Sequence, residues 1–454
     1  MRGSKLLLAA FLGTAHAATL NRRAQCASTL STATTVANQL QTRYDASTGN
    51  YNDGELWTDA NAVEDLHNLM LAAGTTTWGS VGETSRIGRA ALNSGTDWSS
   101  IVAGSWDDSQ WIILALWKIA DYRGAHGQDI TPYMNAASTL YNLVAAQWDS
   151  TCGGGVWWSS ARDYKNAITN ELFLLTSASG YLRTKNADYL TNAKKTWAWL
   201  EGSGMRNAQG LFNDGLTTST CANNGQTTWT YNQGVIASGL GALYAATGNA
   251  TLLDQAEITL DATIAHLTTN NILKESCDNA VAGGAQCNHD QQMFKGIWTK
   301  HVQYYLDQAN SATRSAKYAS FLDSQASAAL HYGKNAANDV GSVWYAPDQG
   351  GSVFSPEAST SGLACFVSDA KYGQCSDGTT TTTTKATTST VTAPATTTTA
   401  ASGSCSGVAA WANNVAYTGG QQVTYNGALW QAAYWTYDDI PGGAAGVWTK
   451  VKTC

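Results

Sequence analysis

The amino-acid sequence predicts a mainly α-helical domain, followed by a low-complexity segment and a small all-β domain. In residues 31–335, apolar residues recur at three- and four-residue spacing between connectors rich in Gly, Asn and Asp. Residues 379–404 are nearly all Thr, Ala and Ser. From Cys405 to Cys454, polar and apolar residues alternate between Gly-containing turns, which is typical of short antiparallel strands.

The helical pattern supports eleven separate helices and leaves room for a twelfth. This number of helices in one unit indicates helix hairpins arranged in a ring or a superhelix. We expect N-caps at Thr131, before Pro132, and at Asn186. Residues 341–376, with Trp344 and Tyr345, show a weaker pattern and are interpreted as a closing segment. The predicted helices are residues 32–45, 57–73, 82–92, 107–122, 131–148, 164–184, 187–201, 231–247, 251–267, 290–309 and 314–332.

The segment 377–404 separates the two domains. Its Thr-rich composition cannot bury enough apolar surface to fold, and it is typical of an O-glycosylated linker. The small domain that follows, 405–454, carries eight Trp and Tyr side chains. Its core is too small to be stable by burial alone, so we expect a disulfide between Cys405 and Cys454.

The N-terminus predicts secretion. A short basic start, an apolar run over residues 6–12 and the sequence Ala15-His16-Ala17 indicate a signal peptide at residues 1–17. Secretion favours disulfides, and Cys277–Cys287 and Cys365–Cys375 are plausible local pairs. Nine cysteines leave one without an intramolecular partner. No stretch is apolar enough to span a membrane, and a net charge of −7 without a basic cluster argues against nucleic acid.

Aromatic side chains are unusually frequent, with 18 Trp and 20 Tyr against 7 Phe. Trp and Tyr offer a flat apolar face with a polar edge, which suits stacking on sugar rings. The alternative is that secreted proteins often carry many aromatic residues.

The most informative stretch is Ser105 to Trp111, "SWDDSQW", where two carboxylates lie between tryptophans at the start of an apolar helical pattern. Two adjacent like charges should differ in proton affinity, one ionising readily and the other holding its proton. Cleavage of a glycosidic bond needs this pair of states. The alternative is a solvated helix start, which the helix dipole favours by itself. Adjacent side chains of a regular helix point about 100° apart, so carboxyls at the distance of a retaining enzyme need Asp107 in non-helical geometry. The first turn or the preceding loop provides that geometry, and free N–H groups there can stabilise one carboxylate.

Four motifs in order resemble glycoside hydrolase family 76: "SWDDSQW", "GGGVWW" at 153–158, "TYNQG" at 230–234 and "DQQMFKGIW" at 290–298. The resemblance implies an (α/α)6 barrel over residues 18–376 and retaining, endo-acting hydrolysis of α-1,6-mannan. It also implies that Asp107 is the nucleophile and Asp108 the general acid/base.

Around these motifs we expect the residues that bind substrate. The alternatives are core packing for the aromatic residues, helix capping for the amides and a structural ion pair for Lys295. Arg162 and Asn166 are further polar candidates, Asp290 is closer to a structural role, and His289 and His301 are interpreted as ordinary histidines. The predicted substrate-binding residues are Trp57, Trp111, Trp157, Trp158, Asn170, Tyr231, Asn232 and Lys295.

The tail, with "YNGALWQAAYWT", is similar to carbohydrate-binding modules of families 5 and 12. That resemblance implies that surface aromatics bind an insoluble wall glycan such as chitin, and we select Trp411, Tyr434 and Trp435. Tyr434-Trp435 stands where the family often has two tryptophans, which leaves the ligand open. The alternative is a purely structural aromatic cluster.

Three functions remain open from the sequence. The first is a secreted mannan endo-1,6-α-mannosidase, monomeric, extracellular or wall-associated, without a metal or organic cofactor. The second is a wall transglycosylase that acts on the glycolipid anchors of mannoproteins. The third, which the intact pair of carboxylates disfavours, is a non-catalytic glycan-binding protein.

Overall fold

The computed structural model describes residues 25–51, 54–375, 405, 407–433, 435–443 and 445–454. The predicted signal peptide 1–17, the predicted linker 377–404 and Tyr434 lie outside these residues. Within them, every helix is too short or too polar to cross a membrane.

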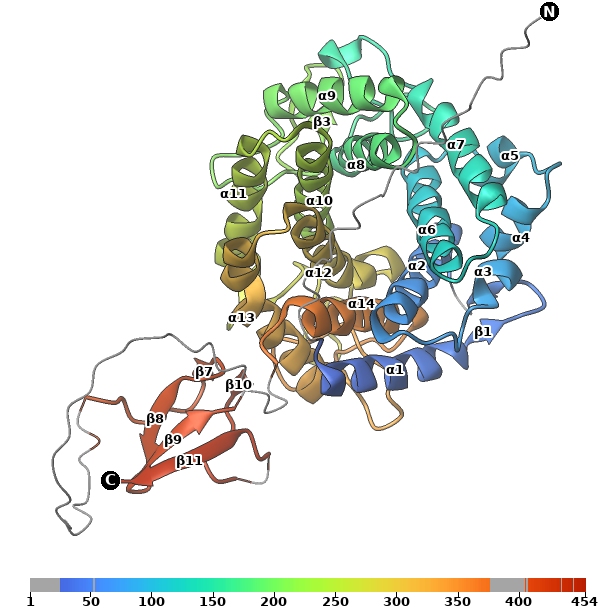
Figure 1. Cartoon of the computed structure of the whole chain (residues 1–454). Coiled ribbons are helices and arrows are strands. Elements are labelled where there is room, and N and C mark those ends of the chain that lie inside the picture. The colour runs from blue at the N-terminus through green and yellow to red at the C-terminus, as the bar shows by residue number, and fades with distance from the viewer. Residues whose placement is uncertain (1–24, 52–53, 376–404, 406, 434, 444) are drawn as a thin grey trace, which may run out of the picture.

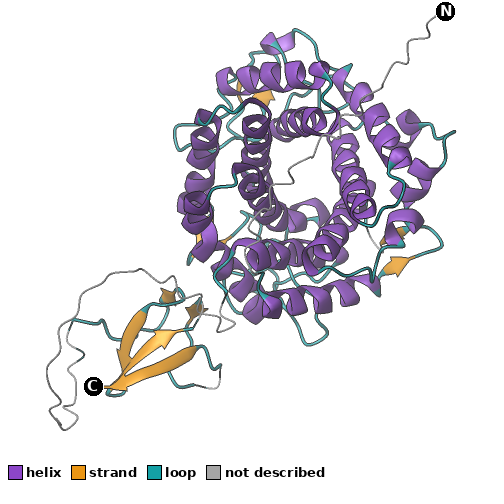
Figure 2. Cartoon of the chain, in the orientation of Figure 1, coloured by secondary structure: helices purple, strands orange, loops and turns teal. Residues whose placement is uncertain are grey.

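Six helices form a closed inner ring, with the remaining helices packed around it (Figures 1 and 2). This is an (α/α)6 barrel, which confirms the ring among the arrangements that the sequence left open. The inner helices, in ring order, are α2 (Leu56–Ala73), α6 (Trp106–Ala125), α8 (Ala167–Thr184), α10 (Thr230–Thr247), α12 (His289–Ala309) and α14 (Pro356–Tyr372). The outer helices are α1 (Ala27–Gln41), α3 (Val81–Thr84), α4 (Arg86–Leu92), α5 (Trp98–Val102), α7 (Thr131–Ala145), α9 (Ala187–Gly202), α11 (Thr251–His266) and α13 (Ala312–Ala328).

Small residues let the inner helices approach one another closely. A Cβ on Gly234 of α10 would lie 2.7 Å from the Cα of Trp298 in α12, and one on Gly296 would lie 2.3 Å from the Cα of Ser361 in α14. The barrel interior is also polar. Lys300 of α12 reaches Glu64 at 2.8 Å and Asp65 at 3.1 Å in α2, so a buried ion pair joins two inner helices.

The helix predictions hold in kind and differ in detail. The predicted helix 82–92 is broken, because Ser85 is extended (ψ 154°) and caps α4 by accepting from the backbone N–H of Gly88. Asn186 is confirmed as an N-cap, while Thr131 is the first residue of α7 and Ile130 precedes it as the cap. The segment 341–376, interpreted as a closing segment, contains the helix α14, which was not predicted and which completes the inner ring.

The disulfides correct one predicted pair. Cys277–Cys287 and Cys405–Cys454 are confirmed. Cys365–Cys375 is wrong: Cys365 is a free thiol buried on α14, and Cys375 bonds to Cys26, next to the first helix. The remaining pair, Cys152–Cys221, joins two connections of the barrel.

Short two-stranded hairpins interrupt the barrel connections, and short antiparallel strands build the C-terminal module, as predicted. A core of Tyr417, Val423, Ala432, Val447 and Trp448 fills the module. The hairpins are β1 (Tyr44–Asp45) with β2 (Asn50–Tyr51), β3 (Leu216–Thr217) with β4 (Ala222–Asn223), and β5 (Thr268–Thr269) with β6 (Ile272–Leu273). The module contains a pair, β7 (Ala416–Tyr417) with β10 (Thr436–Tyr437), and a sheet ordered β8 (Gln422–Tyr425), β9 (Ala428–Ala432), β11 (Trp448–Thr453).

Candidate active site

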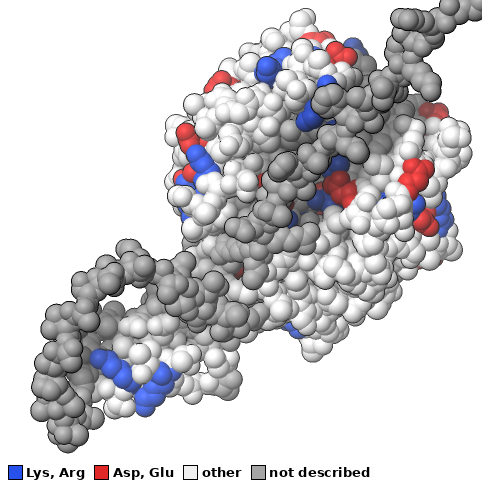
Figure 3. All heavy atoms as spheres, viewed as in Figure 1, with Lys and Arg blue, Asp and Glu red and all other residues white. Residues whose placement is uncertain are grey.

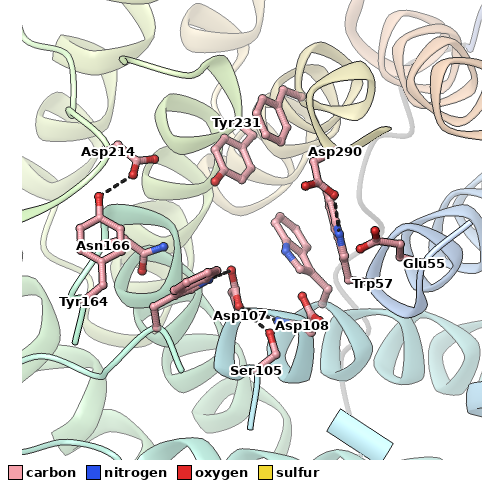
Figure 4. A pocket seen from close by; sticks show the side chains of 13 residues that line it. Glu55, Trp57, Ser105, Asp107, Asp108, Tyr164, Asn166, Asp214, Tyr231 and Asp290 are labelled. Atoms are coloured by element: carbon pink, nitrogen blue, oxygen red, sulfur yellow. Dashed lines mark hydrogen bonds between the residues drawn. The ribbon is translucent and has the colours of Figure 1, made fainter. Parts of the chain in front are cut away.

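A pocket of about 390 Å³ opens at the end of the barrel where the inner helices begin (Figure 4). Five carboxyl-bearing residues line it together with aromatic rings, and no Lys or Arg is among its lining residues. Charged side chains are sparse on the parts of the molecular face that Figure 3 leaves uncovered. The lining residues are Glu55, Trp57, Ser105, Asp107, Asp108, Trp111, Trp158, Tyr164, Asn166, Asp214, Tyr231, Asp290 and Phe294.

The aspartate pair is held at the pocket by the start of α6. Ser105 is extended and forms an isolated antiparallel bridge with Ser159, and the backbone N–H of Trp106 donates to the carbonyl of Trp158 at 3.0 Å. The helix begins at Trp106, one residue before the predicted start, so Asp107 is helical and the expectation of non-helical geometry is wrong. Both Asp107 and Asp108 therefore occupy its first turn, where backbone N–H groups lack partners within the helix.

Three donors converge on the carboxylate of Asp107. The hydroxyl of Ser105 donates to Oδ1 at 3.0 Å, the backbone N–H of Asp108 donates to the same oxygen at 3.1 Å, and the indole of Trp158 donates to Oδ2 at 2.9 Å. Burial raises the pKa of Asp107 to about 6, and these hydrogen bonds limit the rise because they stabilise the ionised form.

Asp108 holds its proton more tightly. Burial and, next, the charge of Asp107 raise the pKa of Asp108 to about 8. The two adjacent carboxyl groups thus differ in proton affinity, with Asp107 the more readily ionised. At neutral pH the pair favours one carboxylate and one carboxylic acid, the combination required for general acid catalysis beside a nucleophile.

Four of the predicted substrate-binding residues line the pocket. Trp57 donates from its indole to Oδ1 of Asp290 at 3.0 Å and packs against Trp111, which is almost fully buried. Tyr231 stacks on Phe294 with ring centroids 3.9 Å apart. Trp158 is 43% exposed, so its ring offers a free face to a ligand.

The other four predicted substrate-binding residues are buried away from the pocket, so direct sugar contact does not fit their positions. The indole of Trp157 donates to Asp149 at 2.7 Å, and Asn170 exchanges hydrogen bonds with the backbone of Val156. Lys295 forms a fully buried ion pair with Asp278 at 2.6 Å, which is the structural alternative weighed above. Asn232 is fully buried, and its side-chain amide has no hydrogen-bond partner.

Several pocket residues were missed or undervalued. Tyr164 donates to Asp214 at 2.5 Å, and burial raises the pKa of Asp214. Asp214 lies in the connection between α9 and α10, and none of the four motifs includes that connection. Asn166, an undervalued candidate, caps α8 at the pocket, and its Oδ1 has no hydrogen-bond partner. Glu55 was missed because it lies outside every motif, whereas Ser105 and Phe294 were not selected although "SWDDSQW" and "DQQMFKGIW" contain them.

In the C-terminal module, Trp411 is half-buried and lies beside Tyr425, with ring centroids 5.4 Å apart. Trp435 is only 1% exposed, because its ring packs against Tyr332 of the barrel. Its predicted role as a surface glycan contact does not fit this position.

Comparison with known proteins agrees with this architecture. Curated relatives include two proteins named mannan endo-1,6-alpha-mannosidase. DFG5 of Candida albicans is 27% identical over 37% of this chain and 39% of the relative. DCW1 of Candida glabrata is 30% identical over 43% of this chain and 45% of the relative. The chain therefore spans less than half the length of these relatives. Residues 410–449 match the carbohydrate-binding module family 5/12.

Solved structures share the fold at low sequence identity. One is an alpha-1,6-mannanase of Salegentibacter in complex with alpha-1,6-mannotriose, in an inactive variant with two consecutive aspartates changed to asparagine. Its TM-score is 0.63 at 20% sequence identity, and the match covers 75% of this chain and 99% of that chain. Another is Dfg5 of Chaetomium thermophilum in complex with glucosamine. Its TM-score is 0.65 at 17% sequence identity, and the match covers 78% of this chain and 93% of that chain. The pattern described as glycosyl hydrolase family 76 matches residues 28–383, more than three quarters of the sequence, and the chain belongs to that family.

Proposed function

We propose that this protein is a secreted, retaining, endo-acting glycosidase that cleaves α-1,6-mannan. The observation that carries the proposal is the pair of carboxyl groups on the first turn of α6, which share one pocket and differ in proton affinity. Relatives named mannan endo-1,6-alpha-mannosidases and the mannanase solved with alpha-1,6-mannotriose support the choice of substrate.

In the first step, the ionised carboxylate of Asp107 attacks the anomeric carbon, and the bond from that carbon to the glycosidic oxygen breaks. The carboxylic acid of Asp108 gives its proton to the leaving oxygen, which departs as a sugar hydroxyl. In the second step, the Asp108 carboxylate removes a proton from water, and the hydroxide oxygen displaces Asp107 from the anomeric carbon. Each carboxyl group ends in its initial state, and two inversions give net retention.

The surroundings of Asp107 support its role as the nucleophile. Hydrogen bonds from Ser105, Trp158 and the Asp108 backbone favour the anionic form, which must be present before attack and is restored at the end. Trp57, Trp158 and Tyr231 wall the pocket with apolar faces that can stack on the sugar rings on either side of the cleaved bond.

A second candidate is glycosyl transfer from the glycolipid anchor of a mannoprotein, in which a wall-glucan hydroxyl replaces water in the second step. The observation that favours it is the charge of the pocket: five carboxyl groups without a lining Lys or Arg suit a donor that contains an amino sugar. The relative solved with glucosamine supports the same reading. Hydrolysis needs no acceptor beyond water and remains the first proposal.

We further propose an extracellular or wall-associated location. The signal-peptide pattern at residues 1–17 and four disulfides in the described chain support it, because disulfides persist in oxidising compartments. The partner of the C-terminal module is an insoluble wall glycan, and chitin is the first ligand to test. The protein is proposed to act as a monomer.

The test is product analysis on linear α-1,6-mannan, with and without a glucan acceptor. Shorter mannan fragments with free reducing ends in the α configuration indicate retaining endo-hydrolysis, whereas hybrid products indicate transfer. A matched Asp107→Asn variant should lose both activities while it keeps the wild-type circular dichroism spectrum. Single mannose units as the first product would argue against endo action.

A further inference from the structure

The C-terminal module is attached to the barrel by the side chain of Trp435. Its indole N–H donates to the backbone carbonyl of Asn270 at 2.9 Å, and its ring meets Tyr332 edge to face, with centroids 5.6 Å apart. Only 1% of the residue is exposed, and it belongs to the main hydrophobic core of the chain rather than to the module's own core. A ring in this position cannot stack on a sugar, so its contact is with the catalytic domain.

Hydrogen bonds on both sides of Trp435 fix the orientation of the module. Ser327 of α13 donates to the carbonyl of Trp435 at 3.1 Å. The hydroxyl of Tyr332 donates to the carbonyl of Tyr437 at 2.6 Å and lies 3.2 Å from a carboxylate oxygen of Asp439. Tyr332 stands in the π-helical turn η2 (Ala329–Gly333) that extends α13. Contacts through backbone and side chain at several points define one orientation rather than a loose tether.

The attachment lies at the same end of the barrel as the pocket. Asn270 is in the β5–β6 hairpin between α11 and α12, and Tyr332 is in the connection between α13 and α14. Connections that lead from an outer to an inner helix lie at the end of the barrel where the pocket opens, since the inner helices begin there. Glu275, just after the hairpin, accepts hydrogen bonds from the backbone and hydroxyl of Thr230, the neighbour of pocket-lining Tyr231.

The module keeps a second set of aromatic side chains that take no part in this attachment. Trp411, Tyr425 and Trp430 are half-buried and lie together, since Trp411 packs on Tyr425 and the Trp430 indole donates to the Tyr425 carbonyl at 3.1 Å. We propose that the module is a fixed extension of the active-site rim, in which Trp435 is the anchor and the Trp411–Tyr425–Trp430 group holds the glycan. A polysaccharide longer than the pocket is then gripped at both places.

This inference rests on the proposed function for its substrate, but the attachment can be tested separately. The full chain is compared with Trp435→Ala, with Tyr332→Phe, which removes only the hydroxyl and its hydrogen bonds to Tyr437 and Asp439, and with the double variant. Trp411→Ala is the contrasting variant, and Val451→Ala, at an exposed position of β11, is the neutral control. Four properties are measured: the maximum dimension from X-ray scattering, binding to insoluble chitin and to α-1,6-mannan, kcat/KM on α-1,6-mannotetraose, and kcat/KM on long linear α-1,6-mannan.

We expect the double variant to have a larger maximum dimension, to bind insoluble glycan within about twofold of wild type and to cleave mannotetraose normally. On long mannan its KM should rise roughly threefold or more, because the two binding sites no longer share a fixed geometry. Trp411→Ala should weaken glycan binding and leave the scattering unchanged. Tyr332→Phe should lie between the wild type and the double variant.

Two results overturn the inference. The first is X-ray scattering of the wild type that is explained only by a module moving freely relative to the barrel. The second is a Trp435→Ala variant that loses glycan binding while its X-ray scattering is unchanged. A wild type that binds neither chitin nor mannan overturns the glycan-holding role of the aromatic group. A wild type that cleaves no mannan but has the compact dimension and binds glycan refutes the proposed function alone, and the anchor role of Trp435 stands.

Discussion

The indole N–H of Trp158 donates a hydrogen bond of 2.9 Å to Oδ2 of Asp107. The two residues are brought together by backbone pairing, since the N–H of Trp106 donates to the carbonyl of Trp158 and the N–H of Ser160 donates to the carbonyl of Gly104. The connection that carries the "GGGVWW" motif is thus attached to the start of α6. Trp158, predicted to bind substrate, therefore also donates a hydrogen bond that favours the ionised form of the proposed nucleophile.

Trp158→Phe should test this second role. Phenylalanine keeps an aromatic face but removes the donor, which for a charged acceptor contributes about 1.5–3 kcal/mol. We expect kcat to fall roughly 10- to 100-fold. Loss of a donor to the anionic form raises the pKa of Asp107, so the acidic limb of the kcat/KM–pH profile should move to higher pH.

Trp157→Phe is the matched control for that variant. Its indole donates to Asp149, outside the pocket, so the substitution should lower thermal stability and leave the acidic limb in place. An unchanged pH profile in Trp158→Phe would show that the indole does not affect Asp107, whatever its effect on kcat.

The aspartate pair also predicts the shape of the pH profile itself. Activity requires Asp107 ionised and Asp108 protonated, and burial raises the pKa of Asp107 to about 6 and that of Asp108 to about 8. Activity should therefore rise as pH increases through about 6, and fall as Asp108 loses its proton near 8. The two apparent values belong to the coupled pair. The measurement is kcat/KM on a soluble α-1,6-mannooligosaccharide from pH 4 to 10.

Asp108→Asn separates the two limbs of this profile. The amide cannot donate a proton to the leaving oxygen, so turnover of mannan should fall by about 10²–10⁴-fold. A substrate with a good leaving group, such as an aryl α-mannobioside, needs no proton in the first step. The rapid initial release of the aryl leaving group should therefore persist in this variant. The rate of that release should no longer fall at alkaline pH. A retained alkaline limb would assign the proton to another group.

The sequence identified the aspartate pair, but it did not identify all of the residues that surround the pair in the pocket. "SWDDSQW" placed Asp107 and Asp108 at a helix start because a local motif carries both the charge and the apolar helical pattern. Glu55 and Asp214 could not be found in this way, since each reaches the pocket from a different connection and only the barrel brings them together.

The failure to predict helix α14 has a different cause, which lies in the composition of its sequence. Small or polar side chains make up most of the segment "PEASTSGLACFVSDA", although every residue of Pro356–Ala370 is buried. Buried polar residues such as Glu357, Ser359 and Asp369 leave few large apolar residues at three- and four-residue spacing, which is the pattern that predicts a helix. The wrong pairing of Cys365 rested on proximity in the sequence, since Cys375 is the nearest cysteine to it.

The disulfide Cys26–Cys375 should stabilise the closure of the barrel. It joins residues 349 apart in the sequence, next to the start of α1 and beyond the end of α14. Replacing the pair by Cys26→Ser with Cys375→Ser should cost about 2–5 kcal/mol of unfolding free energy. Chemical denaturation measures the loss.

Peptide mapping under non-reducing conditions supplies the control for that measurement. It should recover a Cys26–Cys375 peptide pair, with Cys365 alkylated only after unfolding, because the thiol is buried and burial raises its pKa. Recovery of a Cys365–Cys375 pair would restore the pairing first expected from the sequence.

Glu171, in the barrel interior, should make the fold lose stability as pH rises above about 4. It is fully buried on α8, neither carboxyl oxygen has a hydrogen-bond partner, and burial raises its pKa well above the usual value. An acid whose pKa is raised by folding stabilises the fold fully at low pH, and the stability is lost as pH rises toward the folded-state pKa. Glu171→Gln should match the wild type near pH 4 and then gain on it by roughly 1.4 kcal/mol per pH unit, followed as unfolding free energy or as melting temperature between pH 4 and 8. Glu201→Gln, at an exposed position on α9, should leave that dependence unchanged. A constant difference between Glu171→Gln and wild type at all pH values would mean that Glu171 ionises as easily in the folded chain as in the unfolded one.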